Sequence, residues 1–187
     1  MTVVEPIRNI DTLCKIKETL IRKNYRDYVL FCLGINSGLR ISDILKLNVE
    51  DVKNKEFLII SEQKTGKFKK IPINENLKAI LQKFTAGRYP KEPLFVSKHN
   101  NRMNRIRAYE IIKQACAFVN LEANIGTHTL RKTFGYHHYR KFKDLAMLQK
   151  IFNHSNSDIT LKYIGIEQDE IDFSYKNFLL WYNLIED

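Results

Sequence analysis

The strongest constraint on the fold is a helical segment, residues 25–37, that is apolar on every side. Its large apolar side chains are Tyr28, Leu30, Phe31, Leu33 and Ile35. A helix at the surface of a globular protein keeps a polar face, so a helix that is apolar all round is predicted to be buried. Gly38 follows directly and is expected to end this helix as its C-cap.

The remaining segments predict a mainly helical chain with one small antiparallel sheet, an α+β fold. Residues 57–63 and 68–73 are rich in β-branched and aromatic side chains, and the turn at residues 64–67 between them predicts a hairpin. Pro72 places its strand at an edge or near a strand end. Further helices are expected over residues 9–22, 74–86, 105–120, 128–141, 144–152, 157–163 and 171–185.

Two polar residues are predicted to cap helices beside candidate functional side chains. Ser42 is expected to be the N-cap of a short helix that has Asp43 in its first turn. Thr127 is expected to cap the helix that begins at His128, where exposed N–H groups of the first turn favour an anion.

The composition describes one domain with a polyanionic partner. The chain has 187 residues, which bury one substantial core. Its 31 Lys and Arg against 21 Asp and Glu give a net charge of +10, which favours nucleic acid. Residues 167–187 hold six acidic side chains and one Lys, so residues 1–166 carry +15 and are expected to contain the DNA surface.

Cysteine usage and hydropathy place the chain in a reducing compartment without a membrane. Cys14, Cys32 and Cys116 show no paired spacing, so a disulfide framework is not expected. No apolar stretch is long enough to span a bilayer, and the N-terminus lacks the apolar region of a signal peptide. The predicted location is the cytoplasm.

Four segments carry residues suited to holding and attacking a phosphodiester. Arg40 follows Gly38-Leu39, and its planar guanidinium suits a bidentate grip on phosphate oxygens. Lys64 on the hairpin turn is suited to protonating a departing alkoxide. Taken singly, an Arg or a turn Lys is more often a solvated surface residue, and Lys64 with its neighbours also fits a non-specific phosphate-binding edge.

The other two segments supply a histidine–arginine pair and a tyrosine. His128 and Arg131 are three residues apart, so they share one helix face. Asn153-His154-Ser155 is followed by Tyr163, which needs positive surroundings to act as a nucleophile because the free pKa of tyrosine is about 10. Spacing alone does not select Tyr163 among the 9 tyrosines of the chain.

Taken together and in order, these residues resemble the catalytic domain of the tyrosine recombinases, the phage integrase family. Gly-Leu-Arg-Ile-Ser-Asp at 38–43 is similar to the first catalytic box of that family, and Lys64 lies on the corresponding hairpin. His128 and Arg131 match its His-x-x-Arg motif, and His154 with Tyr163 nine residues later matches its final histidine and nucleophile. The similarity spans roughly residues 7–170.

The resemblance implies a site-specific recombinase or integrase that cleaves and rejoins DNA through a 3′-phosphotyrosine. Arg40, Arg131 and His154 would hold the scissile phosphate, and His128 would take the proton of Tyr163. Lys64 would protonate the 5′-oxygen, and Asp43 would orient a catalytic side chain. No metal or cofactor is implied, since His99 stands alone and His137-His138 lacks helical ligand spacing.

Six basic residues outside this set are candidate contacts to double-stranded DNA, although basic residues of this kind are also common on solvated surface. They lie on the hairpin and ahead of the helix at 105–120: Lys67, Lys69, Lys70, Arg102, Arg105 and Arg107.

The resemblance also implies a tetramer on DNA, and the acidic C-terminal tail is the candidate contact between subunits. It carries an apolar stripe at helical spacing, made by Ile171, Tyr175, Phe178, Tyr182 and Ile185. This stripe is expected to pack either on a neighbouring subunit or on the core of its own chain.

The sequence departs from the family in two ways. Asn153 stands where the family usually has Gly before the last histidine, and Asn is expected to take the same positive φ. The helical DNA-clamping domain that normally precedes the catalytic domain is expected to be absent. Two other functions remain open: an enzyme similar to type IB topoisomerases that cleaves without strand exchange, and a non-catalytic DNA-binding regulator.

Overall fold

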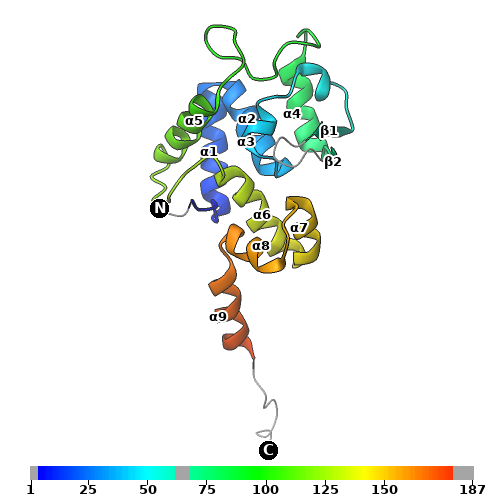
Figure 1. Ribbon diagram of the computed structural model, residues 1–187. Coiled ribbons are helices and arrows are strands. Elements are labelled where there is room, and N and C mark those ends of the chain that lie inside the picture. The colour runs from blue at the N-terminus through cyan, green and yellow to red at the C-terminus, as the bar shows by residue number, and fades with distance from the viewer. Residues whose placement is uncertain (1–3, 62–67, 179–187) are drawn as a thin grey trace, which may run out of the picture.

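The computed structural model describes residues 4–61 and 68–178 as a mainly helical chain with one two-stranded sheet. Helices α1 to α5 and the sheet form the upper part in Figure 1, and α6, α7 and α8 form the lower part. Each part has its own apolar cluster. Helix α6 belongs to both clusters, because Leu130 packs in the larger one and Phe134, one turn later, packs in the smaller one.

Helix α2 (Tyr25–Ser37) lies at the centre of the larger part, as its apolar sequence predicts. It packs against α1 (Ile10–Lys23), α4 (Glu75–Thr85) and α6 (Thr129–Phe142). Its side chains from Val29 to Leu33 are all almost completely buried. Gly38 ends it in the left-handed conformation with φ 64°, which confirms the predicted C-cap.

Helix α3 (Ile41–Ile44) begins before the residue predicted to cap it, so the assignment of Ser42 as N-cap is wrong. Arg40 occupies the N-cap position in an extended conformation, and its carbonyl accepts the N–H groups of Asp43 and Ile44. The chain therefore turns into the helix directly at Arg40. A short 3-10 helix, η1 (Val49–Asp51), follows and is closed by a capping box with Asn48.

The sheet is the predicted hairpin of two antiparallel strands, β1 (Phe57–Ser61) and β2 (Phe68–Pro72). Phe57 pairs with Pro72 and Ser61 with Phe68, so the two strands pair as the predicted hairpin requires. Residues 62–67 of this turn lie outside the described residues. Leu58 and Ile60 point into the core, whereas Ile59 is exposed, so the hairpin has one buried and one open face.

The described residues after 100 form helices at nearly the predicted places. These helices are α5 (Arg105–Ala117), α6, α7 (Leu145–Phe152), α8 (Ser157–Ile164) and α9 (Glu167–Asn177). Helix α5 stops three residues early, and Asn120 then turns the chain with φ 52°. Helix α9 begins at 167 rather than 171, and it ends at Asn177, so Phe178 of the predicted helix is not helical. Residues 179–185 of that prediction lie outside the described residues.

The N-terminal segment is hydrogen-bonded to the lower part, while the side chain of Ile7 packs in the larger apolar cluster. The N–H of Ile7 donates to Thr133 Oγ1 at 2.9 Å, and its carbonyl oxygen lies 2.9 Å from His137 Nε2. Arg8 donates to the carbonyl of Gly165 at 2.8 Å, at the end of α8. Residues 5–8 thus form a strap across α6 and α8.

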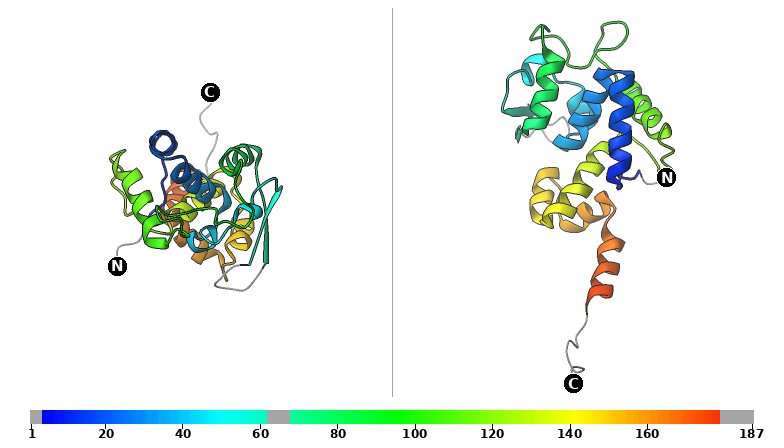
Figure 2. Two further views of the ribbon diagram at one scale, coloured as in Figure 1. Left: turned by 90° about the horizontal axis from the view of Figure 1, so that it is seen from above. Right: turned by 180° about the vertical axis from the view of Figure 1, so that it is seen from behind.

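Helix α9 projects away from the rest of the chain (Figures 1 and 2) and makes its main contacts with its neighbour α8. Its apolar side chains are open to solvent: Ile171 is 45%, Phe173 57% and Tyr175 82% exposed. Tyr182 and Ile185 of the predicted stripe lie outside the described residues. Within residues 4–61 and 68–178, no helix is long and apolar enough to cross a membrane.

The close approach of α2 and α6 provides a test of the packing. A Cβ atom added at Gly34 would lie 2.4 Å from Leu130 Cδ1, so Gly34→Ala should lower the free energy of unfolding by about 1–3 kcal/mol. Leu130→Ala alone should cost about 2–5 kcal/mol through its cavity. Because the double variant removes the clash, its loss should fall short of the sum by about 0.5 kcal/mol or more in urea unfolding. Strict additivity would contradict the predicted contact.

Candidate active site

Tyr163 lies in the last turn of α8 with its hydroxyl against the start of α6. Asn156 caps α8 by accepting the N–H of Ile159, and Gly165 ends the helix at φ 72°. The Tyr163 ring is half-buried and meets Phe152 edge-on, with ring centroids 5.4 Å apart. Both ends of this short helix are therefore fixed, and the ring is packed from one side.

His128 is within hydrogen-bond distance of the Tyr163 hydroxyl. Nδ1 of His128 lies 3.1 Å from Tyr163 Oη, and the two rings meet edge-on. His128 itself is the N-cap of α6, although its side chain makes no capping bond, so the assignment of Thr127 as cap is wrong. The hydroxyl of Thr129 instead accepts the N–H of Gly126 and closes the turn ahead of the helix.

Arg131 is the buried centre of the site, only 3% exposed. Its Nη1 donates to the carbonyl of Gly38 at 2.6 Å, and its Nη2 donates to the carbonyl of Phe152 at 3.0 Å. Gly38 lies two residues before Arg40, and Phe152 two residues before His154. One guanidinium thus holds together the two segments that carry the other candidate phosphate-binding residues.

His154 is oriented by the turn at Asn153 and by Thr160. Asn153 adopts φ 55° at the C-cap of α7, which confirms that it takes the conformation expected of a Gly there. Nδ1 of His154 lies 3.1 Å from Thr160 Oγ1, whose hydroxyl donates to the carbonyl of Asn156. Because that hydroxyl proton is already used, Nδ1 of His154 is the donor in their contact. The His154 ring centroid is 5.2 Å from that of Tyr163.

The positive charges around the site lower the pKa of both titratable centres, whereas burial shifts the two pKa values in opposite directions. Burial raises the pKa of Tyr163, while the positive charges of Arg131 and Arg40 lower it. Partial burial lowers the pKa of His128, and so do the charges of Arg131, Arg105, Arg40 and Lys132. His128 is therefore neutral at pH 7 and can accept a proton from the tyrosine hydroxyl.

The structure brings together five of the six predicted catalytic residues and leaves one outside its description. His128, Arg131, His154 and Tyr163 share direct contacts or a common partner, and Arg40 is close enough to shift the pKa of His128 and Tyr163. Lys64 lies outside the described residues. Asp43 is 4% exposed at the first turn of α3, on the same short segment as Arg40.

The six predicted DNA-contacting residues differ in the contacts that their charged groups make within the chain. Lys67 lies outside the described residues. Lys69 donates to the carbonyl of Ile151 at 2.6 Å, and the Lys70 ammonium lies 4.0 Å from the Phe57 ring centroid. Arg102 donates to the carbonyls of Leu45 and Leu47, so it braces the loop after α3.

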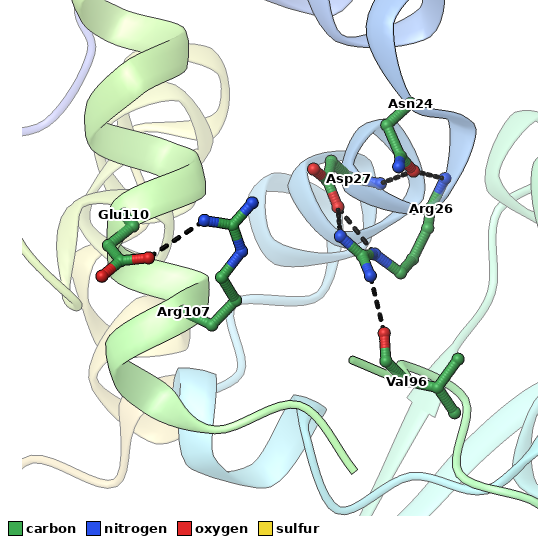
Figure 3. Close-up of polar contacts among 6 residues, drawn as sticks. All are labelled: Asn24, Arg26, Asp27, Val96, Arg107 and Glu110. Atoms are coloured by element: carbon green, nitrogen blue, oxygen red, sulfur yellow. Dashed lines mark hydrogen bonds and ion pairs between the residues drawn. The ribbon is translucent and has the colours of Figure 1, made fainter. Parts of the chain in front are cut away.

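The two arginines at the start of α5 differ from each other as well. Arg107 is paired with Glu110 at 3.0 Å, as Figure 3 shows. Arg105 is exposed at the first position of the helix, and its charge reaches His128. Elsewhere in Figure 3, Arg26 donates to the carbonyl of Val96, which fixes a loop far from the site.

Two residues of the site were missed by reasoning from the sequence. Thr160 is completely buried beneath His154, and Lys132 is 7% exposed with its ammonium 5.0 Å from the Tyr163 ring centroid. The spacing of four residues between His128 and Lys132 places them on one helix face, a signal that was available in the sequence. No group of three or more His, Cys, Asp or Glu suited to a metal ion occurs among the described residues.

A tyrosine hydroxyl beside a neutral histidine, with Arg131 and Arg40 close by, is suited to nucleophilic attack on an anionic group.

Comparison with known proteins supports this reading of the site. Residues 8–170 match the phage integrase family. The probable integrase/recombinase YoeC of Bacillus subtilis is 50% identical over 179 residues, which cover 95% of this chain and 98% of that protein. Tyrosine recombinase XerA of Pyrococcus horikoshii is 31% identical over 151 residues, 78% of this chain and 52% of that one.

Solved structures show the same fold. The crystal structure of XerA recombinase superposes with a TM-score of 0.77 at 18% identity, covering 97% of this chain and 68% of that one. A lambda integrase dimer bound to a core site gives 0.70 at 15% identity, covering 100% of this chain and 64% of that one. The chain spans about half the length of the Xer recombinases that it matches in sequence.

The chain belongs to the phage integrase family, whose members are DNA strand-cleaving and rejoining enzymes. Its fold is that of the tyrosine recombinase catalytic domain.

The positive charges near His128 give a prediction for its pKa. Arg105 is exposed, so Arg105→Gln should leave the fold intact while removing one charge that lowers the pKa of His128. The pKa of His128, followed by NMR titration, should rise toward its ordinary value. Arg107→Gln is the matched control, because Arg107 is paired with Glu110 and does not contribute to the pKa of His128. Equal effects of the two substitutions would contradict this assignment.

Proposed function

We propose that this chain cleaves and rejoins DNA at specific sites with Tyr163 as its nucleophile. The observation that carries the proposal is the 3.1 Å contact between His128 Nδ1 and Tyr163 Oη beside the buried Arg131. A phenol is a weak nucleophile at pH 7, and an adjacent neutral base together with fixed positive charge is what activates it. Among the tyrosines whose contacts are described, Tyr163 has this combination.

The proposed cleavage step exchanges one phosphate ester for another. Tyr163 Oη attacks the scissile phosphorus while its proton passes to His128, and the bond from phosphorus to the 5′-oxygen breaks. Lys64 gives a proton to that oxygen, so the products are a 3′-phosphotyrosine and a free 5′-hydroxyl. Rejoining is the reverse attack by a 5′-hydroxyl. Because the energy of the phosphodiester is kept in the tyrosyl ester, no ATP is required.

The proposed role of the surrounding cations is to stabilise the pentacoordinate transition state. Arg40, Arg131 and His154 carry donors that can meet the non-bridging oxygens of the phosphate. Two contacts support these roles. Arg131 joins the segments that carry Arg40 and His154, and Thr160 fixes the orientation of the His154 ring. Asp43 is proposed to orient Arg40, from which it is separated by a single helical turn.

The proposed partner is double-stranded DNA, and the proposed place of action is the cytoplasm. The net charge of +10 supports a polyanionic substrate. Several of the solved structures with this fold are recombinase or integrase complexes with DNA. The exposed Arg105 and Lys70 are the best candidates among the described residues for direct phosphate contacts, whereas Arg102 and Lys69 first donate to carbonyls of the chain itself.

The cleavage step can be trapped with a nicked DNA substrate that loses its 5′-hydroxyl fragment after attack. We expect a covalent 3′ adduct with the wild-type chain and none with Tyr163→Phe, which keeps the ring packing. Tyr139→Phe is the control, because Tyr139 packs in the same cluster without contacting His128. An adduct that persists in Tyr163→Phe would reject this nucleophile.

The same substrate separates the competing functions. Absence of an adduct on every cognate site would favour a non-catalytic regulator. An adduct with supercoil relaxation but no exchange between two sites would favour chemistry similar to that of type IB topoisomerases. Exchange between two sites is the expected result.

The C-terminal residues are proposed to join subunits in a tetramer on DNA. Helix α9 exposes Ile171, Phe173 and Tyr175 and packs little on its own chain, so the described part of the stripe does not cover the core. A cleft of about 410 Å³ between β2, the end of α2 and the helices α6 and α7 offers a complementary surface. Its lining is mostly apolar and includes Lys69 and Lys150, whose positive charges suit an acidic helix.

Sedimentation of the protein on DNA tests this assembly. Tyr175→Ser removes an apolar side chain that is 82% exposed, and it should weaken self-association, as should deletion of residues 168–187. Tyr89→Ser, at 79% exposure on a loop outside α9, is the matched control and should leave self-association unchanged. Unchanged association of the deletion variant would reject the exchange of this segment.

A further inference from the structure

We propose that Lys132 is a positioning residue that holds the Tyr163 ring and favours its ionised form. The inference deepens the proposed function, because it concerns how the same tyrosine is made acidic. It starts from geometry: the Lys132 ammonium lies 5.0 Å from the centroid of the Tyr163 ring, over the ring rather than at its hydroxyl. A cation in this position is attracted by the π-face.

Helix α6 presents two residues to the same tyrosine. His128 and Lys132 are four residues apart and therefore lie on one face of α6, which packs against α8. His128 meets the Tyr163 hydroxyl at 3.1 Å, and Lys132 meets the ring. One helix thus contacts the phenol at two places, through His128 and through Lys132. The buried Arg131 lies between these two residues in the sequence.

Lys132 is buried, and burying a lysine is unfavourable unless its ammonium group has a favourable contact. Its side chain is 7% exposed, and lysine is seldom buried so far. Burial lowers the pKa of Lys132, and the carboxylate of Glu5 in the N-terminal strap partly offsets this. The ring of Tyr163 is the contact that the ammonium makes inside the site.

The attraction between the ammonium and the ring grows when the phenol ionises. Part of the phenolate charge is delocalised over the ring, so the cation then meets a net negative charge in addition to the π-face. The neutral phenol benefits less. Arg131 and Arg40 already lower the pKa of Tyr163 against the desolvation that raises it. From its place over the ring, Lys132 is expected to act in the same sense.

The charged and titratable groups that face the His128–Tyr163 pair come from several elements. They are Arg40 at α3, Arg105 at α5, Arg131 and Lys132 on α6, and His154 after α7. Glu5 from the strap acts on Lys132 rather than on the pair itself. Removing the charge of Lys132 should raise the pKa of Tyr163 and also that of His128. The acidic limb of the cleavage rate, where His128 becomes protonated, should then move to higher pH.

The test compares Lys132→Met, which keeps the aliphatic length without charge, with Lys132→Arg, which keeps the charge. Cleavage of the nicked substrate at pH 7 should fall about tenfold in the Met variant, which corresponds to one pKa unit of tyrosine acidity, and should largely recover in the Arg variant. DNA binding, measured in a Tyr163→Phe background, should be the same with Lys or Met at this position. A Met variant that cleaves with the wild-type rate and pH profile would overturn the proposal.

Titration without DNA separates this proposal from the proposed function. With [13Cζ]tyrosine, the Tyr163 signal is assigned by its loss in Tyr163→Phe, and its pKa should be higher in Lys132→Met and Lys132→Gln than in the wild type or in Lys132→Arg. This result would stand even if no adduct formed on DNA. An unchanged pKa of Tyr163 in folded Met or Gln variants would overturn it.

The wild-type protein supplies a measurement that needs no substitution. Protons of the Lys132 ε-methylene should resonate upfield because they lie over the Tyr163 ring, and they should shift again as Tyr163 ionises. A random-coil chemical shift for these protons would overturn the proposal even if every neutral variant failed to fold.

Discussion

The site depends on one buried cation bridging two turns of the chain. Arg131 donates to the carbonyls of Gly38 and Phe152, which are separated by 114 residues in sequence but lie on either side of the same guanidinium. Loss of this side chain would leave two buried carbonyl groups without their donor, at a cost of about 1–3 kcal/mol each. Because the two turns lead into Arg40 and His154, the bridge sets the geometry of the site as well as its stability.

Each of the two bridged turns contains a residue in the left-handed conformation. Gly38 has φ 64° and Asn153 has φ 55°. A left-handed residue lets a helix end sharply and turns the next side chains back across it. Gly38 also lies against Phe134, where an added Cβ would approach within 2.6 Å of the ring, so this glycine meets a packing constraint as well.

The sequence predicted most of the fold because its strongest signals are local. The buried helix at 25–37, the hairpin and the cap at Gly38 follow from side-chain chemistry within a few residues. The positive φ of Asn153 was expected from the family resemblance, because Asn stands there in place of a Gly. Ser42 and Thr127 were predicted as caps because Ser and Thr are common at that position. Both predictions were wrong, since the N-cap residues are Arg40 and His128. The register of a helix start depends on tertiary contacts that a short window does not contain.

The candidate site was predicted as a set of residues but not as a geometry. The order of motifs selected Arg40, His128, Arg131, His154 and Tyr163, and the structure brings these together. That order does not reveal that Arg131 is buried against carbonyls or that Thr160 orients His154. Lys132 was missed because a lysine in a basic chain of 31 Lys and Arg is expected to be solvated, and only the packing of α6 on α8 makes it a buried one.

The strap at residues 5–8 determines where mechanical load enters the molecule. Ile7 is bonded to Thr133 and His137 of α6, and Arg8 to Gly165 at the end of α8. Ile7 also packs in the larger apolar cluster, so a pull on the chain ahead of Glu5 reaches the helices of Tyr163 together with the main core, and before it reaches α1. A bulky fusion joined at this end needs a flexible spacer, since a rigid one would act as a lever on the tyrosine itself.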